Sequence, residues 1–80
     1  MRIDKFLKVA RLVKRRTVAN EICSLGKVTI NGRVVKPSSE VKEGDIVEIH
    51  FANKSTRVEV VSVAENASKA EAAKMIKIIG

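Results

Sequence analysis

Residues 16–32, RTVANEICSLGKVTING, contain the change from helical to extended periodicity that decides the fold. Four apolar residues in the first part recur at helical spacing: Val18, Ala19, Ile22 and Leu25. Thr17 is placed to cap this helix, and Gly26 is placed to end it as the C′ residue. Val28–Ile30 is then a short β-rich run, and Asn31-Gly32 is the strongest short-range hairpin signal. We expect a helix followed directly by a β-hairpin.

The residues before this stretch predict a second amphipathic helix over 3–13. Its apolar positions recur at steps of three and four: Ile3, Phe6, Leu7, Ala10 and Val13. Asp4 is placed to cap the start of this helix or to favour its dipole. Lys8, Arg11 and, if the helix continued, Arg15 would share the direction of Asp4 and form a basic stripe. The two helices, joined by the basic corner 14–16, should pack as a pair.

The residues after the hairpin predict further strands. Residues 33–36 return from the Asn31-Gly32 turn, and Glu43-Gly44-Asp45 is another turn leading into Ile46–Phe51. In that strand three apolar residues alternate with polar ones: Val47, Ile49 and Phe51. Residues 57–63 predict one more strand whose valines do not keep to one face, which a bulge or burial on both faces would explain.

The C-terminal residues predict a short amphipathic helix. Ser68-Lys69-Ala70-Glu71 fits a capping box, and four apolar residues follow at helical spacing: Ala72, Met75, Ile76 and Ile79. The expected architecture is a single α+β domain over residues 1–80, with a core motif at about 1–51 and an added strand and C-terminal helix at 57–79.

The composition indicates the size of the fold and the part of the cell in which the protein is expected. Eighty residues, 45% of them apolar, suit one small domain with a folded core. No apolar run approaches the ~20 residues that cross a bilayer, and charged residues interrupt the N-terminus, so neither a membrane span nor a secretory signal is predicted. Cys23 is the only cysteine and can form no intrachain disulfide, so we expect a cytoplasmic location.

The positive charge is one-sided along the chain. The protein has a net charge of +7, yet residues 1–36 hold ten basic and two acidic residues, whereas residues 37–80 hold six basic and seven acidic residues. A surface shaped only by solubility would intersperse the two signs, and a concentrated positive field favours a polyanionic partner.

The residue types exclude most catalytic chemistry. His50 and Cys23 are single and lie on different predicted elements, so no zinc site and no Cys-His or Ser-His-Asp set is predicted. Four acidic residues could hold a cation, although solvated turn residues are the simpler interpretation: Glu40, Glu43, Asp45 and Glu48. We therefore expect no enzyme, cofactor, small-molecule substrate or metal.

The aromatic residues constrain the binding mode. Phe6 and Phe51 are the only aromatics and both are predicted in the core, so no platform for base stacking is expected. The predicted target is folded or double-stranded RNA recognised by shape and phosphate geometry, and on charge alone DNA stays open.

Three motifs in order resemble the S-four RNA-binding domain: Arg2-Ile3-Asp4-x-x-Leu7; Arg16-Thr17-x-Ala19-x-x-Ile22-x-x-x-Gly26-x-Val28-x-Ile30-Asn31-Gly32; and Gly44-Asp45-x-Val47. The resemblance implies the S-four-like (alpha-L) fold, in which two packed N-terminal helices lie on a small bent antiparallel sheet. It also implies that the first helix, the corner between the helices and the hairpin turn face RNA.

The resemblance implies an RNA-binding set from the helices and their corner: Arg2, Asp4, Lys5, Lys8, Arg11, Lys14, Arg15, Arg16 and Thr17. Lys27, Arg33 and Lys36 would extend this surface from the hairpin. Asp4 has two open roles. It either caps the helix or orients the guanidinium group of Arg2, Arg15 or Arg16 through a charge-assisted hydrogen bond.

Over essentially the whole chain the sequence is similar to the RqcP (YabO) family of bacterial ribosome-quality-control factors. The similar parts are residues 1–6, the corner 14–17 and the tail 71–79. This resemblance implies binding to the rRNA and peptidyl-tRNA of stalled large ribosomal subunits, and support for alanine tailing by the factor RqcH. Two alternatives stay open: a heat-shock-type recycling factor for blocked large subunits, and a general rRNA- or mRNA-binding regulatory module.

Overall fold

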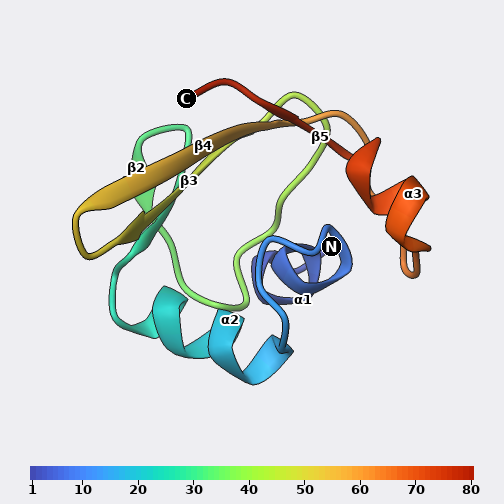
Figure 1. Cartoon of the computed structure of the whole chain (residues 1–80). Helices are drawn as coiled ribbons and strands as arrows, with labels where there is room; N and C mark the ends of the chain where they lie inside the picture. Colours follow the sequence, from blue (N-terminus) through green and yellow to red (C-terminus); the bar gives the residue numbers. More distant parts are fainter.

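The computed structural model describes all 80 residues as an α+β fold, which confirms the predicted class (Figure 1). The elements follow in the order α1 (Ile3–Val9), α2 (Arg16–Ser24), β1 (Val28–Ile30), β2 (Arg33–Val34), β3 (Ile46–Phe51), β4 (Lys54–Val60), α3 (Lys69–Ala73) and β5 (Ile76–Ile78). The five strands form one antiparallel sheet in the order β2-β1-β3-β4-β5. Figure 1 shows α1 and α2 together on one side of this sheet, with α3 beside its end.

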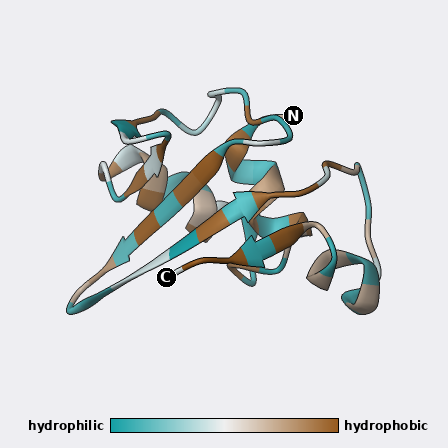
Figure 2. Ribbon diagram, turned by 90° about the horizontal axis from the view of Figure 1, so that it is seen from above, coloured by the Kyte–Doolittle hydropathy of each residue, from teal (hydrophilic) through white to brown (hydrophobic).

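The core lies between the helix pair and the sheet. The alternation predicted for β3 buries Val47 and Ile49, which pair with Val58 of β4 and Val28 of β1, and all four side chains are buried. Figure 2 shows this alternation as bands of opposite hydropathy along the strands. From α1 the sheet receives three side chains with no exposed surface: Ile3, Phe6 and Leu7. Each fully buried apolar side chain of this size contributes about 1.5–3 kcal/mol.

Two predicted turns are confirmed by their backbone angles. Gly26 has φ +75° and closes α2 with hydrogen bonds from its own amide to Cys23 O and from the Lys27 amide to Ile22 O, the Schellman arrangement. Asn31 and Gly32 have φ of 52° and 84°, as a two-residue hairpin loop of type I′ requires. The capping box at Ser68 and Glu71 is also present at the start of α3.

The N-terminal helix is shorter than predicted. Periodicity predicted a helix to Val13, but α1 ends at Val9, and Arg11 has φ +60° as the C′ residue of a second Schellman turn. Ala10 and Val13 follow α1 and are still buried in the same core as its apolar residues, so the helical spacing of apolar residues continues after the helix has ended. The condition for Arg15 to join the basic stripe, a helix that continues to it, is therefore not met, and Arg11 lies beyond the end of α1.

Two predictions for α2 are also wrong. The helix begins at Arg16 with Arg15 as its N-cap residue and no side-chain capping bond, so Thr17 lies inside the first turn rather than capping it. Val18 and Leu25 are exposed, because the buried face of α2 consists of Ala19, Ile22 and Cys23.

The C-terminal third differs most from the prediction. Strand β4 runs from Lys54 to Val60 without a bulge, and the out-of-phase valines Val61 and Val63 lie exposed beyond its end. The predicted helix stops at Ala73, and Ile76–Ile78 form β5 against β4 instead. An unpaired β4 edge would leave a row of backbone groups without partners, and β-branched isoleucines suit a strand.

Phe51 is 39% exposed, so its predicted place in the core is wrong. Strand β1 pairs only with residues 47–49 of β3, and Phe51 lies beyond that covered part of the strand. None of the helices, the longest of which has nine residues, meets the length and hydrophobicity of a membrane-spanning helix.

Candidate nucleic-acid interface

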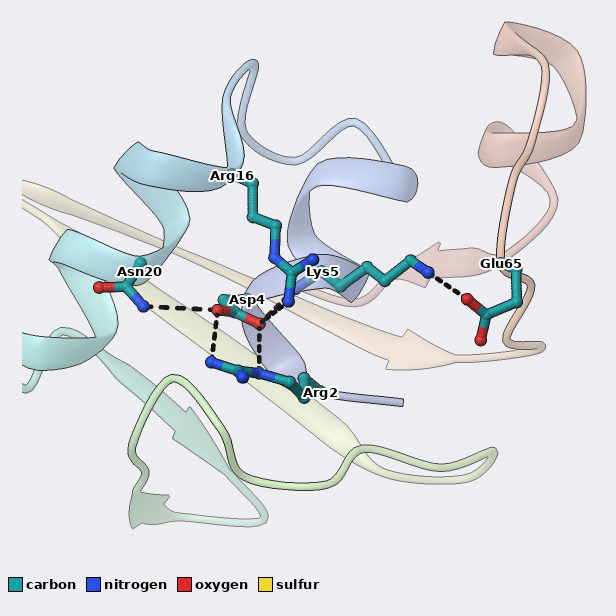
Figure 3. A network of polar contacts seen from close by, with 6 residues as sticks. All are labelled: Arg2, Asp4, Lys5, Arg16, Asn20 and Glu65. Atoms are coloured by element: carbon teal, nitrogen blue, oxygen red, sulfur yellow. Dashed lines mark hydrogen bonds and ion pairs between the residues drawn. The ribbon is translucent and has the colours of Figure 1, made fainter.

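A buried carboxylate organises two of the predicted RNA-facing arginines. Asp4 is only 2% exposed and accepts two hydrogen bonds from Arg2, Nε to Oδ1 at 3.2 Å and Nη2 to Oδ2 at 3.1 Å. Arg16 Nη2 lies 3.4 Å from Oδ1, and Asn20 Nδ2 lies 3.4 Å from Oδ2. Figure 3 shows Arg2 and Arg16 reaching the carboxylate from opposite sides. Asp4 therefore crosslinks the N-terminal residues to α2.

The contacts of Asp4 correspond to parts of both roles considered for it. Its Oδ1 accepts the Lys5 backbone amide at 2.7 Å, so it does satisfy one donor of the first turn, although Arg2 is the N-cap residue. Its remaining hydrogen-bonding capacity holds Arg2 and Arg16, and Arg15 takes no part. The predicted hydrogen bonds to Asp4 are thus present for Arg2 and Arg16, and the prediction that they orient these groups for phosphate stays a prediction.

The local fold explains why these groups meet. Arg2 forms an isolated β-bridge with Glu40, the Ile3 amide donates to Ser39 O at 2.8 Å, and the Val41 amide donates to Met1 O at 2.9 Å. These bonds fix the residue before α1 against the segment 37–41. On α2, Arg16 and Asn20 are separated by one helical turn and so face the same neighbour. Asn20 was not among the predicted site residues, although its i+4 spacing from Arg16 was a usable signal.

The electrostatics of Asp4 follow from its partners. Burial alone would raise the pKa of this carboxyl group. The hydrogen bonds from Asn20, Arg2 and the Lys5 amide, together with the Arg16 charge, outweigh burial and lower the pKa below its ordinary value. Asp4 is therefore ionised at neutral pH.

Arg2 also lines a groove between α2 and the segment 34–38. The groove has a volume of about 670 Å³, and Lys36 and Asn20 line it as well. The side chains of Arg2 and Arg16 remain 48% and 47% exposed while bound to Asp4, so each guanidinium group keeps donors free toward solvent. Such pre-oriented planar donors match the geometry of phosphate oxygens.

Three cations from α1 and the connection between α1 and α2 lie around a second concavity. Lys8, Arg11 and Lys14 line a pocket of about 270 Å³ with Val9, Val13, Asn66 and Ala67. Arg15 and Thr17 are exposed next to it in sequence. Arg2 and Arg16 form one basic cluster, and Lys8, Arg11 and Lys14, the corner cations, form the other; residues 14–16 connect the two along the chain.

The other predicted site residues divide into two groups. Lys27 is exposed directly before β1, and Lys36 lines the groove together with Arg2. Arg33 instead lines a separate depression with Lys42 and Asp45, and it is not among the residues that line the groove of Arg2. Lys5 is bound to Glu65 in an ion pair, which Figure 3 shows, and it is less available than its neighbours.

The single thiol and the acidic residues have local structural roles. Cys23 is 2% exposed, and burial together with the nearby Asp4 charge raises its pKa to about 11, as expected of a packed, unreactive side chain. Asp45 accepts bonds from Asn31 Nδ2 at 3.1 Å and the Lys42 amide at 2.9 Å. No three potential metal ligands come together in the structure.

Comparison with known proteins agrees with this architecture. Residues 1–47 match the S4 domain. The chain belongs to the S4 domain family. A protein of Halalkalibacterium halodurans named RQC P-site tRNA stabilizing factor is 49% identical over 78 residues, covering 98% of this chain and 89% of its own length. A Bacillus subtilis protein of the same name is 47% identical over 79 residues, covering 99% and 92%.

The structural comparison extends this relationship to the C-terminal part. Heat Shock Protein 15 of Vibrio cholerae superposes on this S4 protein with a TM-score of 0.90 at 26% identity. The match covers 99% of this chain and 81% of that chain. The structural likeness to this neighbour therefore extends beyond residues 1–47 to β4, α3 and β5.

Proposed function

We propose that this S4 protein is a non-catalytic RNA-binding factor of bacterial ribosome-associated quality control that works in the cytoplasm. In this proposal it binds the large ribosomal subunit of a stalled translation complex, contacts both rRNA and the peptidyl-tRNA, and stabilises the tRNA in the P site. By holding the tRNA it supports RqcH in adding alanines to the C-terminus of the nascent chain.

The single observation that carries the proposal is the near full-length relationship to proteins named for this role, at 49% and 47% identity. The geometry supports it independently. Arg2 and Arg16 are fixed by Asp4 but half exposed, and Lys8, Arg11 and Lys14, from α1 and the connection between α1 and α2, line a second concavity. Fixed donors suit a folded RNA whose phosphates are also fixed, because little side-chain entropy remains to be lost on binding.

The mechanism we propose is a clamp between two RNA segments. The Arg2–Arg16 cluster would neutralise phosphates of one segment and the corner cations those of another, which holds the tRNA between elongation steps. If about five phosphates are contacted, the logarithm of the binding constant should fall with the logarithm of salt concentration with a slope of about −3.5 to −4.5.

A second candidate is a recycling factor that moves the blocked tRNA without a tailing partner. The likeness to Heat Shock Protein 15, with a TM-score of 0.90, favours considering it. Deleting the gene for the tailing factor separates the two roles. If loss of this S4 protein has the same phenotype with and without RqcH, the recycling role is favoured.

The substitution Arg16→Ala tests the RNA-binding proposal. We expect it to weaken binding to large subunits by about 1–3 kcal/mol, because hydrogen bonds of a charged donor are lost. Co-sedimentation in a sucrose gradient measures this. The matched control is Arg57→Ala on β4, since Arg57 is similarly exposed at 54%, is bound to Glu48 and lies outside both basic clusters. Full retention of Arg16→Ala on ribosomes would remove Arg16 from the site.

A further inference from the structure

The pocket at the helix corner is built from two parts of the chain. One wall comes from the S4 motif and carries Lys8, Arg11 and Lys14, whereas a second wall is formed by Asn66 and Ala67. The matched S4 domain covers residues 1–47, so this second wall lies outside it. The segment after β4 therefore adds a surface to the S4 motif that the motif alone would not have.

The backbone at Arg11 is strained. Its φ of +60° lies in the left-handed region, which is sterically unfavourable for an L-residue and favours glycine. Arg11 occupies the C′ position of α1, which is the usual place for glycine at the end of a helix. We take the charged side chain at a position that favours glycine as the reason to ask what Arg11 binds, although Ala52 shows that positive φ alone marks no site.

The cations of the pocket are free to take a ligand. None of the three takes part in an ion pair of the molecule, and all are exposed. The residues that line the pocket include no acidic side chain. Three unneutralised cations around one concavity repel one another, and an anion seated between them relieves that repulsion.

The second wall is held in place by contacts with α1 and the core. Glu65 is bound to Lys5, directly before Asn66 and Ala67, as Figure 3 shows for the ion pair. Ala64 and Ala67 pack against the hydrophobic core. Lys5 is thus a positioning residue for this wall rather than a free cation.

Resting on the proposed function, we propose that this pocket receives one backbone phosphate of the bound RNA together with its ribose, and that the segment 64–67 is part of the RNA site. Lys8, Arg11 and Lys14 bind the phosphate oxygens. The Asn66 amide donates to a ribose or phosphate oxygen, and Val9, Val13 and Ala67 exclude water from beneath the sugar.

The substitution Asn66→Asp tests this inference, because it places a negative charge in the pocket at almost unchanged size. The matched control is Asn53→Asp in the β3–β4 turn, which changes net charge equally and lies outside both basic clusters. Binding of each variant to purified large ribosomal subunits is measured at fixed salt. We expect Asn66→Asp to bind about three- to tenfold more weakly than wild type and Asn53→Asp to stay within about twofold.

A second variant separates binding from folding. Arg11→Gly removes a pocket cation but relieves the backbone strain, so we expect a melting temperature no lower than that of wild type together with binding weakened about three- to tenfold. Unchanged binding by both Asn66→Asp and Arg11→Gly, while Arg16→Ala still loses binding, would overturn this inference and leave the proposed function intact. Equal weakening by Asn66→Asp and Asn53→Asp would overturn it too. Absence of binding by the wild-type protein would overturn both.

Discussion

The substitution Asp4→Asn removes one charge from the centre of the Arg2–Arg16 cluster and keeps the size of the side chain. The carboxylate accepts from five donor atoms: Arg2 Nε, Arg2 Nη2, Arg16 Nη2, Asn20 Nδ2 and the Lys5 amide. An asparagine has one acceptor oxygen, so its own amide nitrogen must face donors on one side. The variant therefore loses partners and also introduces a donor–donor contact.

The loss of stability can be worked from these contacts. A hydrogen bond to a charged group contributes about 1.5–3 kcal/mol, and the best placed pair here is the bidentate contact with Arg2. Both arginines are about half exposed, so water compensates for part of the loss. We expect the free energy of unfolding to fall by about 1–3 kcal/mol, and each kcal/mol lowers Tm by about 4–8 °C in a domain of this size.

For RNA binding, the expected effect of Asp4→Asn is the opposite of what its change in net charge alone would produce. Asp4→Asn raises the net charge from +7 to +8, which by itself would strengthen attachment to a polyanion. If the orientation of Arg2 and Arg16 matters, binding should instead weaken by about five- to fiftyfold, equivalent to about 1–2.3 kcal/mol. The assay is binding to large ribosomal subunits well below the Tm of the variant.

The charge-matched control is Glu43→Gln, which neutralises an exposed acid in the turn before β3. We expect its binding to equal or slightly exceed that of wild type. If folded Asp4→Asn binds as tightly as Glu43→Gln, the cations act only through their number. The reasoning from geometry would then be refuted.

Two further predictions follow from the pKa shifts of buried groups. Because the pKa of Asp4 is lowered in the folded state, the stabilisation from its carboxylate is fully present above the unfolded value near 3.8 and is lost as pH falls through the folded pKa. Circular dichroism with denaturant should therefore show stability falling more steeply below pH 4 in wild type than in Asp4→Asn, and equal slopes would contradict the shift. Burial raises the pKa of Cys23 to about 11, so its thiol should react with a disulfide reagent at pH 8 only slowly in the folded protein and fully in denaturant. Rapid labelling of the folded chain would show that this part of the core opens.

The sequence predicted the parts of the fold whose signals are local. Gly26, the Asn31-Gly32 turn and the alternation in β3 depend on neighbouring residues only; the first two are confirmed, and the alternation is confirmed for Val47 and Ile49 but not for Phe51. The end of α1 was missed because Ala10 and Val13 keep helical spacing after the helix has ended. The strand 76–78 was missed because it forms by pairing with the edge of β4, which is distant in sequence, and no local sequence signal indicates that pairing.

The candidate site shows the same division. Counting charges predicted which residues are basic and exposed, since the ten cations are concentrated in residues 1–36. Charge counting could not predict which basic residue forms an ion pair with which acidic residue. Glu65 lies sixty residues from Lys5, and the choice of Arg16 over Arg15 depends on which residue begins α2. Which acidic partner a basic residue binds depends on the tertiary structure, whereas the presence of many basic residues in one segment can be read from the sequence.

The shortness of the helices explains why a single carboxylate matters so much to this protein. Helices of seven and nine residues are too short to be stable alone in water, so α1 and α2 hold their places only through tertiary contacts. The guanidinium groups of Arg2 and Arg16 are therefore correctly placed only when residues 37–41 pair with the N-terminus and α2 packs on α1. RNA that binds this arrangement binds the folded state alone, and by mass action it must stabilise the whole domain.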